Sequence, residues 1–262
     1  MLEVISINDS DRWDDIVRSF KDHDVYYLSG YVKAFQIHGD GEPQLIYFEK
    51  ENTRAINVVM KRDISLHKDF TNKINPGKYF DFSTPYGYGG FIIEGEEVTS
   101  LDVEYSNYCV EHNIVSEFVR FHPILNNQKQ VSNIYEIKML SKTISIDLDS
   151  KSMIWENLTS KNRNMIRKAL KSNVKIYWGR SPELIEKFIP MYNQTMDRDE
   201  ATDYYYFDKA FYDSILDDLK YNSLFFYAEY NNQIISMAII LFSNSQMHYH
   251  LSASNRDFQS LG

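Results

Sequence analysis

The chain has 262 residues, a formal net charge of −9, 43% hydrophobic residues and 25% charged residues. This composition is typical of a soluble globular protein, and the acidic balance argues against general affinity for DNA. No apolar run approaches the roughly 20 residues that span a bilayer. The N-terminus lacks the basic and then apolar pattern of a signal peptide, and the single cysteine, Cys109, excludes an internal disulfide. We therefore expect a cytoplasmic protein without a transmembrane segment.

The first half of the chain alternates strands and helices. Asp9 is placed to cap a helix over residues 12–20, and the turn at 51–52 separates two alternating runs, as a hairpin requires. The patterns predict strands at 3–7, 44–49, 55–61, 78–82, 114–121, 136–140 and 143–148, and helices at 12–20, 26–37 and 97–113.

The second half repeats this plan. Pro182 lies at a favourable early position of one helix, and Asn231-Asn232 predicts a tight hairpin turn. The patterns predict helices at 153–158, 161–172, 182–198 and 207–219, and strands at 174–178, 224–230, 234–242 and 247–253. We interpret the repetition as two tandem α/β domains with mixed sheets, residues 1–149 and 150–262.

The last three predicted strands have no helix after them to cover their sheet. A sheet with one bare face and an open edge is unfavourable. Either further helices follow Gly262, or a partner chain, as in a homodimer, covers this surface.

A basic stretch is the strongest charge feature of the chain, because residues 158–182 contain no Asp or Glu. At helical spacing Arg163, Arg167 and Lys171 form one stripe. Like charges four residues apart destabilise a helix, so an anionic partner is one explanation. A solvated helix face is the other, and the sequence leaves both open.

Two further motifs allow a structural or a binding role. The glycine-rich segment at 84–90 suits either an anion-binding backbone or a tight turn that packs aromatic side chains, but it lacks the P-loop pattern. In the alternating run 116–123, Arg120 and His122 would line a cleft, or Arg120 would pair with Glu117 or a nearby acid. Cys109 lies on an apolar helix stripe, which predicts a buried thiol and not a nucleophile.

The helix that ends at Arg198 leads into a run of tyrosines at 204–206. Arg198 could grip a phosphate or a carboxylate in fork geometry, with Tyr205 and its neighbours as the wall of the pocket. Alternatively, the acids at 197, 199 and 200 neutralise it. On the last strand His248 and His250 share one face; with no third ligand at a recognisable spacing we predict no metal site, and either histidine could act as a general base.

Four strings together resemble bacterial Fem-type proteins, the aminoacyltransferases that build peptidoglycan cross-bridges, and the wider set of GNAT-like acyltransferases. The strings are residues 80–90, 116–123, 161–169 and 249–254, so the resemblance spans both halves. It implies two tandem GNAT-like domains, of which the second is incomplete, because the family continues past the position of Gly262. It also implies that a chain ending there is inactive or nearly so.

The resemblance further implies roles for individual residues. Thr195 and Arg198 stand where Fem enzymes contact the phosphates of a nucleotide-linked precursor, and Tyr249 matches an aromatic residue of the same cleft. Lys33 is the nearest candidate for a substrate-binding lysine in the first domain. From the strand pattern we assign His250 as the general base and Tyr249 as a residue that positions the acceptor.

Two donors and one other class of function stay open. We expect an acyl-CoA donor and an amine acceptor on a cell-envelope sugar or nucleotide-linked glycan, without a permanently bound cofactor. With aminoacyl-tRNA as the donor, the stripe that includes Arg163 and Arg167 would contact RNA phosphates. A non-catalytic glycan- or anion-binding module is the third possibility.

Overall fold

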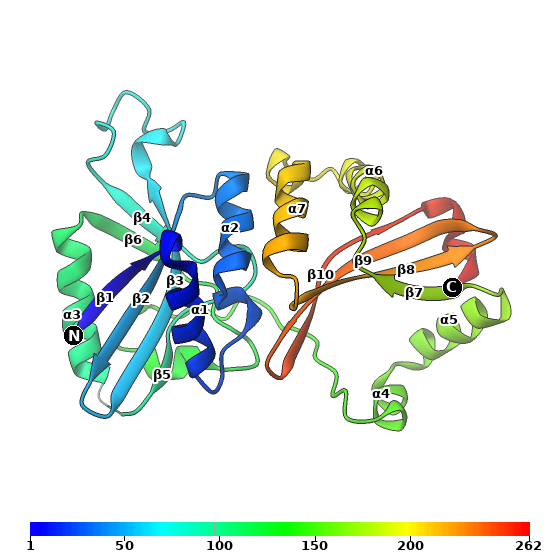
Figure 1. Cartoon of the computed structure of the whole chain (residues 1–262), viewed down its shortest axis with the longest axis horizontal. Helices are drawn as coiled ribbons and strands as arrows, with labels where there is room; N and C mark the ends of the chain where they lie inside the picture. The colour runs from blue at the N-terminus through cyan, green and yellow to red at the C-terminus, as the bar shows by residue number, and fades with distance from the viewer. Residues whose placement is uncertain (97) are drawn as a thin grey trace. The chain divides into compact units, whose positions relative to one another are not determined.

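The computed structural model describes residues 1–96 and 98–262 of the chain. The described residues form two compact units (Figure 1). The first unit consists of residues 1–139, 210–220 and 243–246, and the second of residues 140–209, 221–242 and 247–262. The boundary expected at 149 therefore falls inside the second unit, and the first unit takes two short segments from the later half of the chain.

The first unit is built on a mixed sheet with the strand order β1-β2-β3-β4-β6, in which β5 also pairs with β3. Its strands are β1 (Leu2–Ser6), β2 (Glu42–Lys50), β3 (Thr53–Asp63), β4 (Phe80–Ser83), β5 (Ile92–Glu94) and β6 (Ile114–Phe118). The β4–β6 pair is parallel and the other pairs are antiparallel. The predicted hairpin is confirmed as β2 and β3, whose turn residue Glu51 adopts a φ of 53°.

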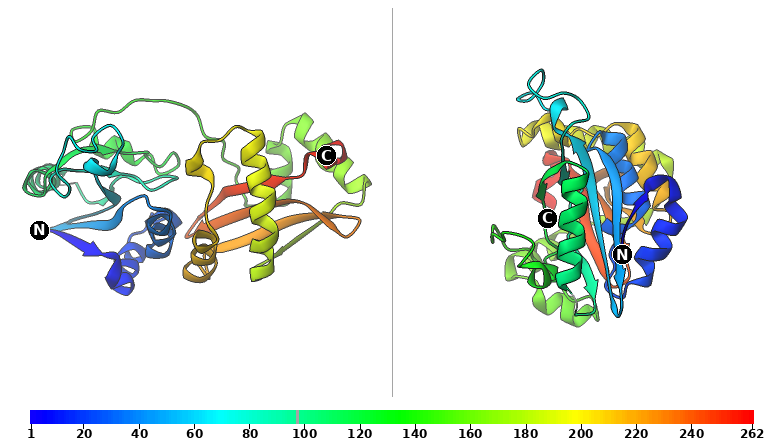
Figure 2. Two further views of the ribbon diagram at one scale, coloured as in Figure 1. Left: turned by 90° about the horizontal axis from the view of Figure 1, so that it is seen from above. Right: turned by 90° about the vertical axis from the view of Figure 1, so that its left-hand side faces the viewer.

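Helices cover both faces of this sheet (Figure 2). They are α1 (Ser10–Ser19), α2 (Ser29–His38) and α3 (Val98–Glu111), with short 3₁₀ helices η1 (Ile7–Asp9), η2 (Val25–Tyr27), η3 (Ile64–Leu66) and η4 (Asn127–Val131). The predicted helix at 97–113 is confirmed over Val98–Glu111, and residue 97 lies outside the described residues. Most of α7 (Lys209–Asp218) also belongs to this unit, where Phe211 packs against Phe35 with ring centroids 5.1 Å apart.

The core between α3 and the sheet follows from the alternation of the strands. Ile46 and Phe48 are two residues apart on β2, so they face the same side, where they pack in one cluster with Leu101 and Tyr105 of α3. Cys109 is half-buried at the margin of this cluster. The position of α3 is thus determined by apolar residues at helical spacing opposite an alternating strand.

The second unit contains a four-stranded sheet with the order β10-β9-β8-β7. Its strands are β7 (Lys175–Gly179), β8 (Ser223–Tyr230), β9 (Gln233–Ser243) and β10 (Gln246–Ser254). Its helices are α4 (Lys151–Asn157), α5 (Ser160–Lys171) and α6 (Pro182–Arg198), with η5 (Asp203–Tyr205) and η6 (Arg256–Leu261). Phe188 of α6 packs edge-to-face on Phe225 of β8, with centroids 6.0 Å apart, so α6 covers one face of the sheet.

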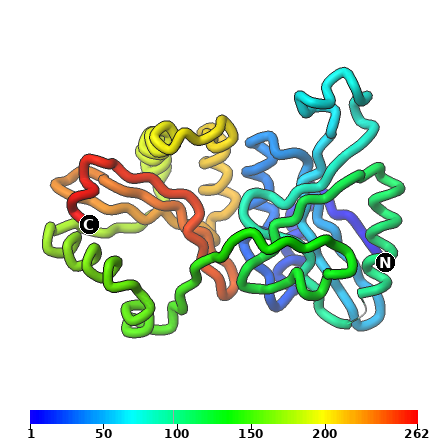
Figure 3. Tube along the Cα trace, turned by 180° about the vertical axis from the view of Figure 1, so that it is seen from behind, coloured from blue at the N-terminus to red at the C-terminus, as the bar shows by residue number. Residues whose placement is uncertain are grey.

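Two predicted strands are wrong. Residues 136–140 and 143–148 form no strand, and the chain runs through this stretch without regular structure (Figure 3). Met139, Leu140 and Ile144 are almost fully exposed. Alternating apolar residues form a strand only where a neighbouring strand supplies hydrogen-bond partners, and no described strand pairs with this stretch. Strand β5 is the opposite case: it exists but was not predicted, because it is only three residues long and shows no alternation.

The predicted fold class is confirmed, because the chain is a mixed α/β protein with two separate sheets. None of the described helices has the length and apolar character needed to cross a bilayer.

Candidate functional site

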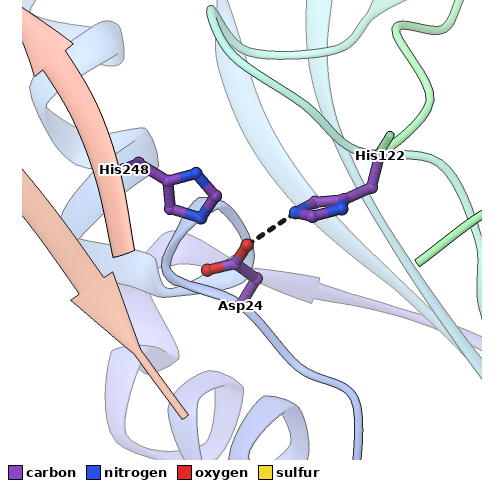
Figure 4. Close-up of side chains that lie close together, drawn as sticks. All are labelled: Asp24, His122 and His248. Atoms are coloured by element: carbon purple, nitrogen blue, oxygen red, sulfur yellow. Dashed lines mark hydrogen bonds and ion pairs between the residues drawn. The ribbon is translucent and has the colours of Figure 1, made fainter. Parts of the chain in front are cut away.

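Two buried polar side chains of the first unit form a pair that sequence reasoning did not combine. Asp24 lies just before η2, and His122 follows β6 (Figure 4). Their side chains are completely buried, and His122 Nε2 lies 2.7 Å from Asp24 Oδ2. His248, which Figure 4 also draws, belongs to the second unit. The sequence signalled His122 through its place in the 116–123 run, but it carried no signal for Asp24.

Hydrogen bonds determine the tautomer of His122. The backbone N–H groups of Ile124 and Leu125 both donate to Nδ1, each at 3.2 Å. Nδ1 must therefore carry a lone pair, so the proton lies on Nε2 and is donated to Asp24. The other oxygen of Asp24 accepts from the backbone N–H of Val25 at 2.6 Å. The arrangement is a neutral imidazole oriented by a buried carboxylate.

Tyrosines surround this pair. The ring of Tyr88 lies 5.5 Å from the ring of His122, and the ring of Tyr26 packs edge-to-face against those of Tyr88 and Tyr31. Burial raises the pKa of Tyr26 well above its ordinary value, with the Asp24 carboxylate as a second cause. Tyr26 therefore stays a neutral hydroxyl at every physiological pH.

The glycine-rich segment 84–90 is a packed turn beside these rings. Gly87 has a φ of +105°, and a Cβ at this position would lie 2.5 Å from the Tyr26 ring. Its polar groups bond within the unit: Gly89 N–H donates to the Arg120 carbonyl, and the carbonyl of Gly90 accepts from the Tyr27 hydroxyl. These contacts support the turn interpretation over an anion-binding backbone.

The residues of the run 116–123 have different surroundings in the structure. The Glu117 carboxylate accepts hydrogen bonds from Asn57, Tyr105 and Tyr135, so its partners are not those proposed from the sequence. Burial raises the pKa of Glu117. Arg120 is exposed, and its guanidinium lies 5.9 Å from the ring centre of Tyr86.

Lys33 of α2 is the substrate-binding lysine predicted for the first unit. Its ammonium group pairs with Asp218 at 2.8 Å, and about half of the lysine side chain is exposed. An exposed ion pair of this kind contributes little stability, and the role of Lys33 in substrate binding stays a prediction.

Thr195 and Arg198 lie in the last turn of α6 in the second unit. The buried Thr195 hydroxyl donates to the carbonyl of Met191, one turn earlier. Arg198 Nε donates to Asp199 at 3.1 Å, and its Nη1 lies 3.5 Å from the carbonyl of Ser254 at the end of β10. Arg198 is thus held near the end of a strand by one carboxylate and one weak carbonyl contact.

The tyrosines after α6 lie close to this end of the helix. Tyr206 donates to Asp197 at 2.7 Å, so this acid is engaged by a hydroxyl. Tyr205, the residue predicted from the sequence, packs edge-to-face on Tyr204 with centroids 5.3 Å apart. The carboxylate in direct contact with Arg198 is that of Asp199.

The basic stripe of α5 is engaged in part within its own unit. Arg163 donates through Nη1 to the carbonyls of Trp155, Glu156 and Leu158, where α4 ends. Arg167 lies 5.1 Å from the ring centre of Trp155. Both guanidinium groups therefore hold the corner between α4 and α5, and this explains their spacing without a ligand.

Tyr249 and His250 are neighbours on β10 with different surroundings. Tyr249 is largely exposed. Burial, with a further contribution from His248, lowers the pKa of His250 to about 3. His250 is therefore neutral at pH 7 and able to accept a proton, although such a low pKa makes it a weak base. Its role as general base stays a prediction.

Cys109 differs from a nucleophilic cysteine. Burial, and secondly the Glu117 carboxylate, raise the pKa of its thiol to about 12. The thiolate is the reactive form, so the thiol is inert at neutral pH. This agrees with the interpretation of Cys109 as a structural residue.

The predicted site residues are divided between the two units. Lys33 lies in the first unit, and Arg163, Arg167, Thr195, Arg198, Tyr205, Tyr249 and His250 lie in the second. Within the second unit the structure brings Arg198 to the end of β10, whereas Arg163 and Arg167 lie at the α4–α5 corner.

Comparison with known proteins identifies the fold. No family model matches the chain, and no curated protein matches its sequence. The crystal structure of FemX is similar over 99% of this chain and 82% of that one, with a TM-score of 0.70 and 12% identity. The C-terminal domain of a protein assigned as a lysylphosphatidylglycerol synthetase from Agrobacterium fabrum has a TM-score of 0.52 and 9% identity, over 96% of this chain and 70% of that one. A conserved protein of unknown function from Bacteroides thetaiotaomicron has a TM-score of 0.51 and 10% identity, over 99% and 81%. The chain has the fold of FemX.

Proposed function

We propose that this protein transfers an aminoacyl or other acyl group to an amine on a cell-envelope precursor. The observation that carries this proposal is the similarity to FemX over 99% of the chain, which includes both units. The Fem-type resemblance of four sequence strings points in the same direction independently of the structure. A fold can host several functions, so the residues of the site and the assay decide the chemistry.

The end of α6 is the site that we propose for a phosphate of the acceptor. Arg198 presents a planar fork, and its contacts to Asp199 and Ser254 use Nε and Nη1. In the part of the chain that the structure describes, Nη2 is left to donate to a phosphate oxygen. The hydroxyl of Thr195 faces the helix backbone, so we propose that Thr195 shapes the turn that carries Arg198.

The proposed reaction needs no enzyme-bound intermediate. The neutral amine of the acceptor attacks the carbonyl carbon of the donor, a C–N bond forms, and the C–O bond of an ester or the C–S bond of a thioester breaks. The amine loses one proton, and the leaving alcohol or thiol gains one. Orientation of the two substrates and stabilisation of the oxyanion are then the main contributions of the protein.

Two donors follow from two different observations. The likeness to FemX favours an aminoacyl ester, as the Fem-type resemblance implies. The net charge of −9 and the engagement of Arg163 and Arg167 at the α4–α5 corner disfavour a large RNA surface and favour acyl-CoA. From the sequence alone we expect acyl-CoA as the first candidate; because of the likeness to FemX we now propose the aminoacyl donor first and acyl-CoA second.

The test is a transfer assay with matched donors and one acceptor. The purified protein is incubated with a UDP-linked muropeptide and with either charged tRNA or labelled acetyl-CoA, and the product is identified by mass spectrometry. We expect an increase in acceptor mass by one aminoacyl or one acyl group. Absence of transfer from both donors, together with thermal stabilisation by the UDP-muropeptide, would identify a binding module instead.

Two variants of Arg198 and one control variant are compared by the thermal stabilisation that the UDP-muropeptide gives them. Arg198→Ala and Arg198→Lys should weaken UDP-muropeptide binding, because lysine keeps the charge but loses the fork. The matched control is Arg256→Lys, at an exposed arginine of η6 in the same unit. Equal binding by all variants would remove Arg198 from the acceptor site while leaving the transferase proposal to the assay.

A further inference from the structure

A pocket of the first unit is lined by β5, by the residues in and next to η4, and by the turn after α1. Among the residues that line it are Asp22, Ile92, Leu125, Lys129 and Gln130. Its volume is about 350 Å³, which lies at the lower end of the range of roughly 300–1,000 Å³ that small-molecule sites occupy. We call it the β5–η4 pocket, and its size suits a small ligand.

Asn127 fixes the wall of the pocket that η4 forms. Its side chain is only 4% exposed, and its Oδ1 accepts the backbone N–H of His122 at 3.0 Å. Its Nδ2 donates to the carbonyls of Gly89 and Phe91 at 2.9 and 3.1 Å. Phe91 comes directly before β5, so one buried amide holds η4 against the start of this strand.

The turn after α1 is tied to the same strand. The backbone N–H of Lys21 donates to the Glu94 carboxylate of β5 at 2.7 Å, and Glu94 also pairs with Arg54 of β3 at 2.6 Å. Asp22 is the next residue of this turn. The walls of the pocket are therefore joined to β5 before any ligand binds, so little binding energy is lost in ordering them.

The polar groups of the pocket are free to meet a ligand. Asp22, Lys129 and Gln130 are exposed, and in the described part of the chain none of their side chains forms an ion pair or a hydrogen bond. Ile92 is buried and Leu125 is half-buried, so these two supply apolar surface. The pocket thus offers one carboxylate, one ammonium group, one amide and an apolar contact.

We propose that the β5–η4 pocket binds a free amino acid with an aliphatic side chain in its zwitterionic form. Asp22 accepts hydrogen bonds from the α-ammonium group, and Lys129 donates to the α-carboxylate. The aliphatic side chain contacts Ile92 and Leu125. A phosphorylated ligand would meet a single lysine and a repelling carboxylate, and a neutral apolar ligand would use neither charge. This proposal does not rest on the transferase function.

Isothermal titration of the 262-residue protein with L-leucine tests the proposal. Three related compounds each lack one group: N-acetyl-L-leucine has no ammonium group, L-leucinamide has no carboxylate, and glycine has no side chain. We expect leucine to bind and each of the three to bind about tenfold more weakly or less, because each has lost one of the contacts.

Variants of the two charged residues assign each contact. Asp22→Asn should weaken leucine binding about tenfold but leave the binding of N-acetyl-L-leucine unchanged, because that compound no longer has the group that Asp22 meets. Lys129→Gln should do the same for leucine and L-leucinamide. The matched controls are Asp15→Asn and Lys68→Gln, at exposed positions of the same unit, and they should bind leucine normally. Thermal melts establish that each variant is folded.

Three results would overturn the proposal. They are absence of leucine binding at millimolar concentration, leucine binding that Asp22→Asn and Lys129→Gln leave unchanged, and an equal loss in the control variants. The second result would place the amino acid at another site of the protein. None of the three bears on the transfer assay with the UDP-muropeptide, so the failure of one proposal is distinguishable from the failure of the other.

Discussion

Asp24 and His122 join segments that are 98 residues apart in the chain through one hydrogen bond of 2.7 Å, with both side chains completely buried. Because His122 also accepts two backbone N–H groups at Nδ1, this single imidazole links the approach to η2 with the loop after β6. A buried carboxylate is tolerated only when it is paired and hydrogen-bonded.

Removing His122 should therefore be costly. We expect His122→Ala to lower the free energy of unfolding by about 3–5 kcal/mol, because the buried Asp24 carboxylate loses the imidazole N–H that it accepts. Urea denaturation measures this loss. His67→Ala, at an exposed histidine of the same unit, is the control and should change stability little. A loss below about 1 kcal/mol for His122→Ala would show that water or another group replaces the imidazole.

Gly87 should be far less tolerant of a side chain than Gly77. Both have positive φ, +105° and +73°, but a Cβ at Gly87 meets the Tyr26 ring, whereas a Cβ at Gly77 meets no atom within 4 Å. We expect Gly87→Ala to cost about 3 kcal/mol and Gly77→Ala about 1 kcal/mol. Thermal melts of the two variants give the comparison. Equal losses would mean that the turn at 84–90 shifts freely.

Arg163 should stabilise the α4–α5 corner. We expect Arg163→Ala to cost about 1.5 kcal/mol, since it removes charged hydrogen bonds to the last carbonyls of α4, and to speed hydrogen exchange in α4. Lys171→Ala, which removes one charge from the same helix, is the matched control. If both changes affect exchange in α4 equally, then charge and not the carbonyl contacts holds the corner.

His250 should make the protein less stable in acid. Its pKa is about 3 in the folded protein and near 6.5 in an unfolded chain, so between these values the unfolded chain binds a proton that the folded protein does not. Stability contributed by the neutral imidazole is complete above about pH 6.5 and is lost as the pH falls toward 3. His250→Gln should reduce the fall in melting temperature over this range. A fall identical to that of the unmodified protein would contradict the lowered pKa.

Cys109 should resist alkylation while the protein is folded. With the pKa of the thiol raised to about 12, very little thiolate exists at pH 8. We expect iodoacetamide to react at least about tenfold more slowly with the folded protein than with the protein in urea. Mass spectrometry follows the modification. Similar rates in both states would show that the thiol is accessible and activated.

Regular patterns predicted most elements correctly. The predicted range 182–198 matches α6 residue for residue, and the Asn231-Asn232 turn joins β8 to β9 as expected. Local spacing succeeds in these places because each segment must bury one face and hydrogen-bond its own backbone. It failed at 136–148, where alternation is present and no described strand pairs with the segment, and at β5, which pairs with β3 although it is only three residues long.

The candidate site residues also include some whose contacts follow from neighbouring positions and some whose contacts do not. Neutralisation of Arg198 by the acids at 197, 199 or 200 was one of two alternatives that the sequence left open, and the structure shows Asp199 in contact with it. The partners of Arg163 are backbone carbonyls of the preceding helix, and a sequence does not show which carbonyls a helix end leaves without a bond. The meaning of the basic stripe therefore changed once its contacts were known.

The amino-acid sequence by itself determined the α/β class, the order of most elements and the inert character of Cys109, because periodicity and composition act over a few neighbouring residues. Only the tertiary structure decided that Asp24 pairs with His122, that α7 belongs mainly to the first unit, and that Leu170, Ile176 and Trp178 stay exposed. These facts depend on contacts between residues far apart in the chain, and such contacts arise from packing of whole elements, which no local pattern encodes.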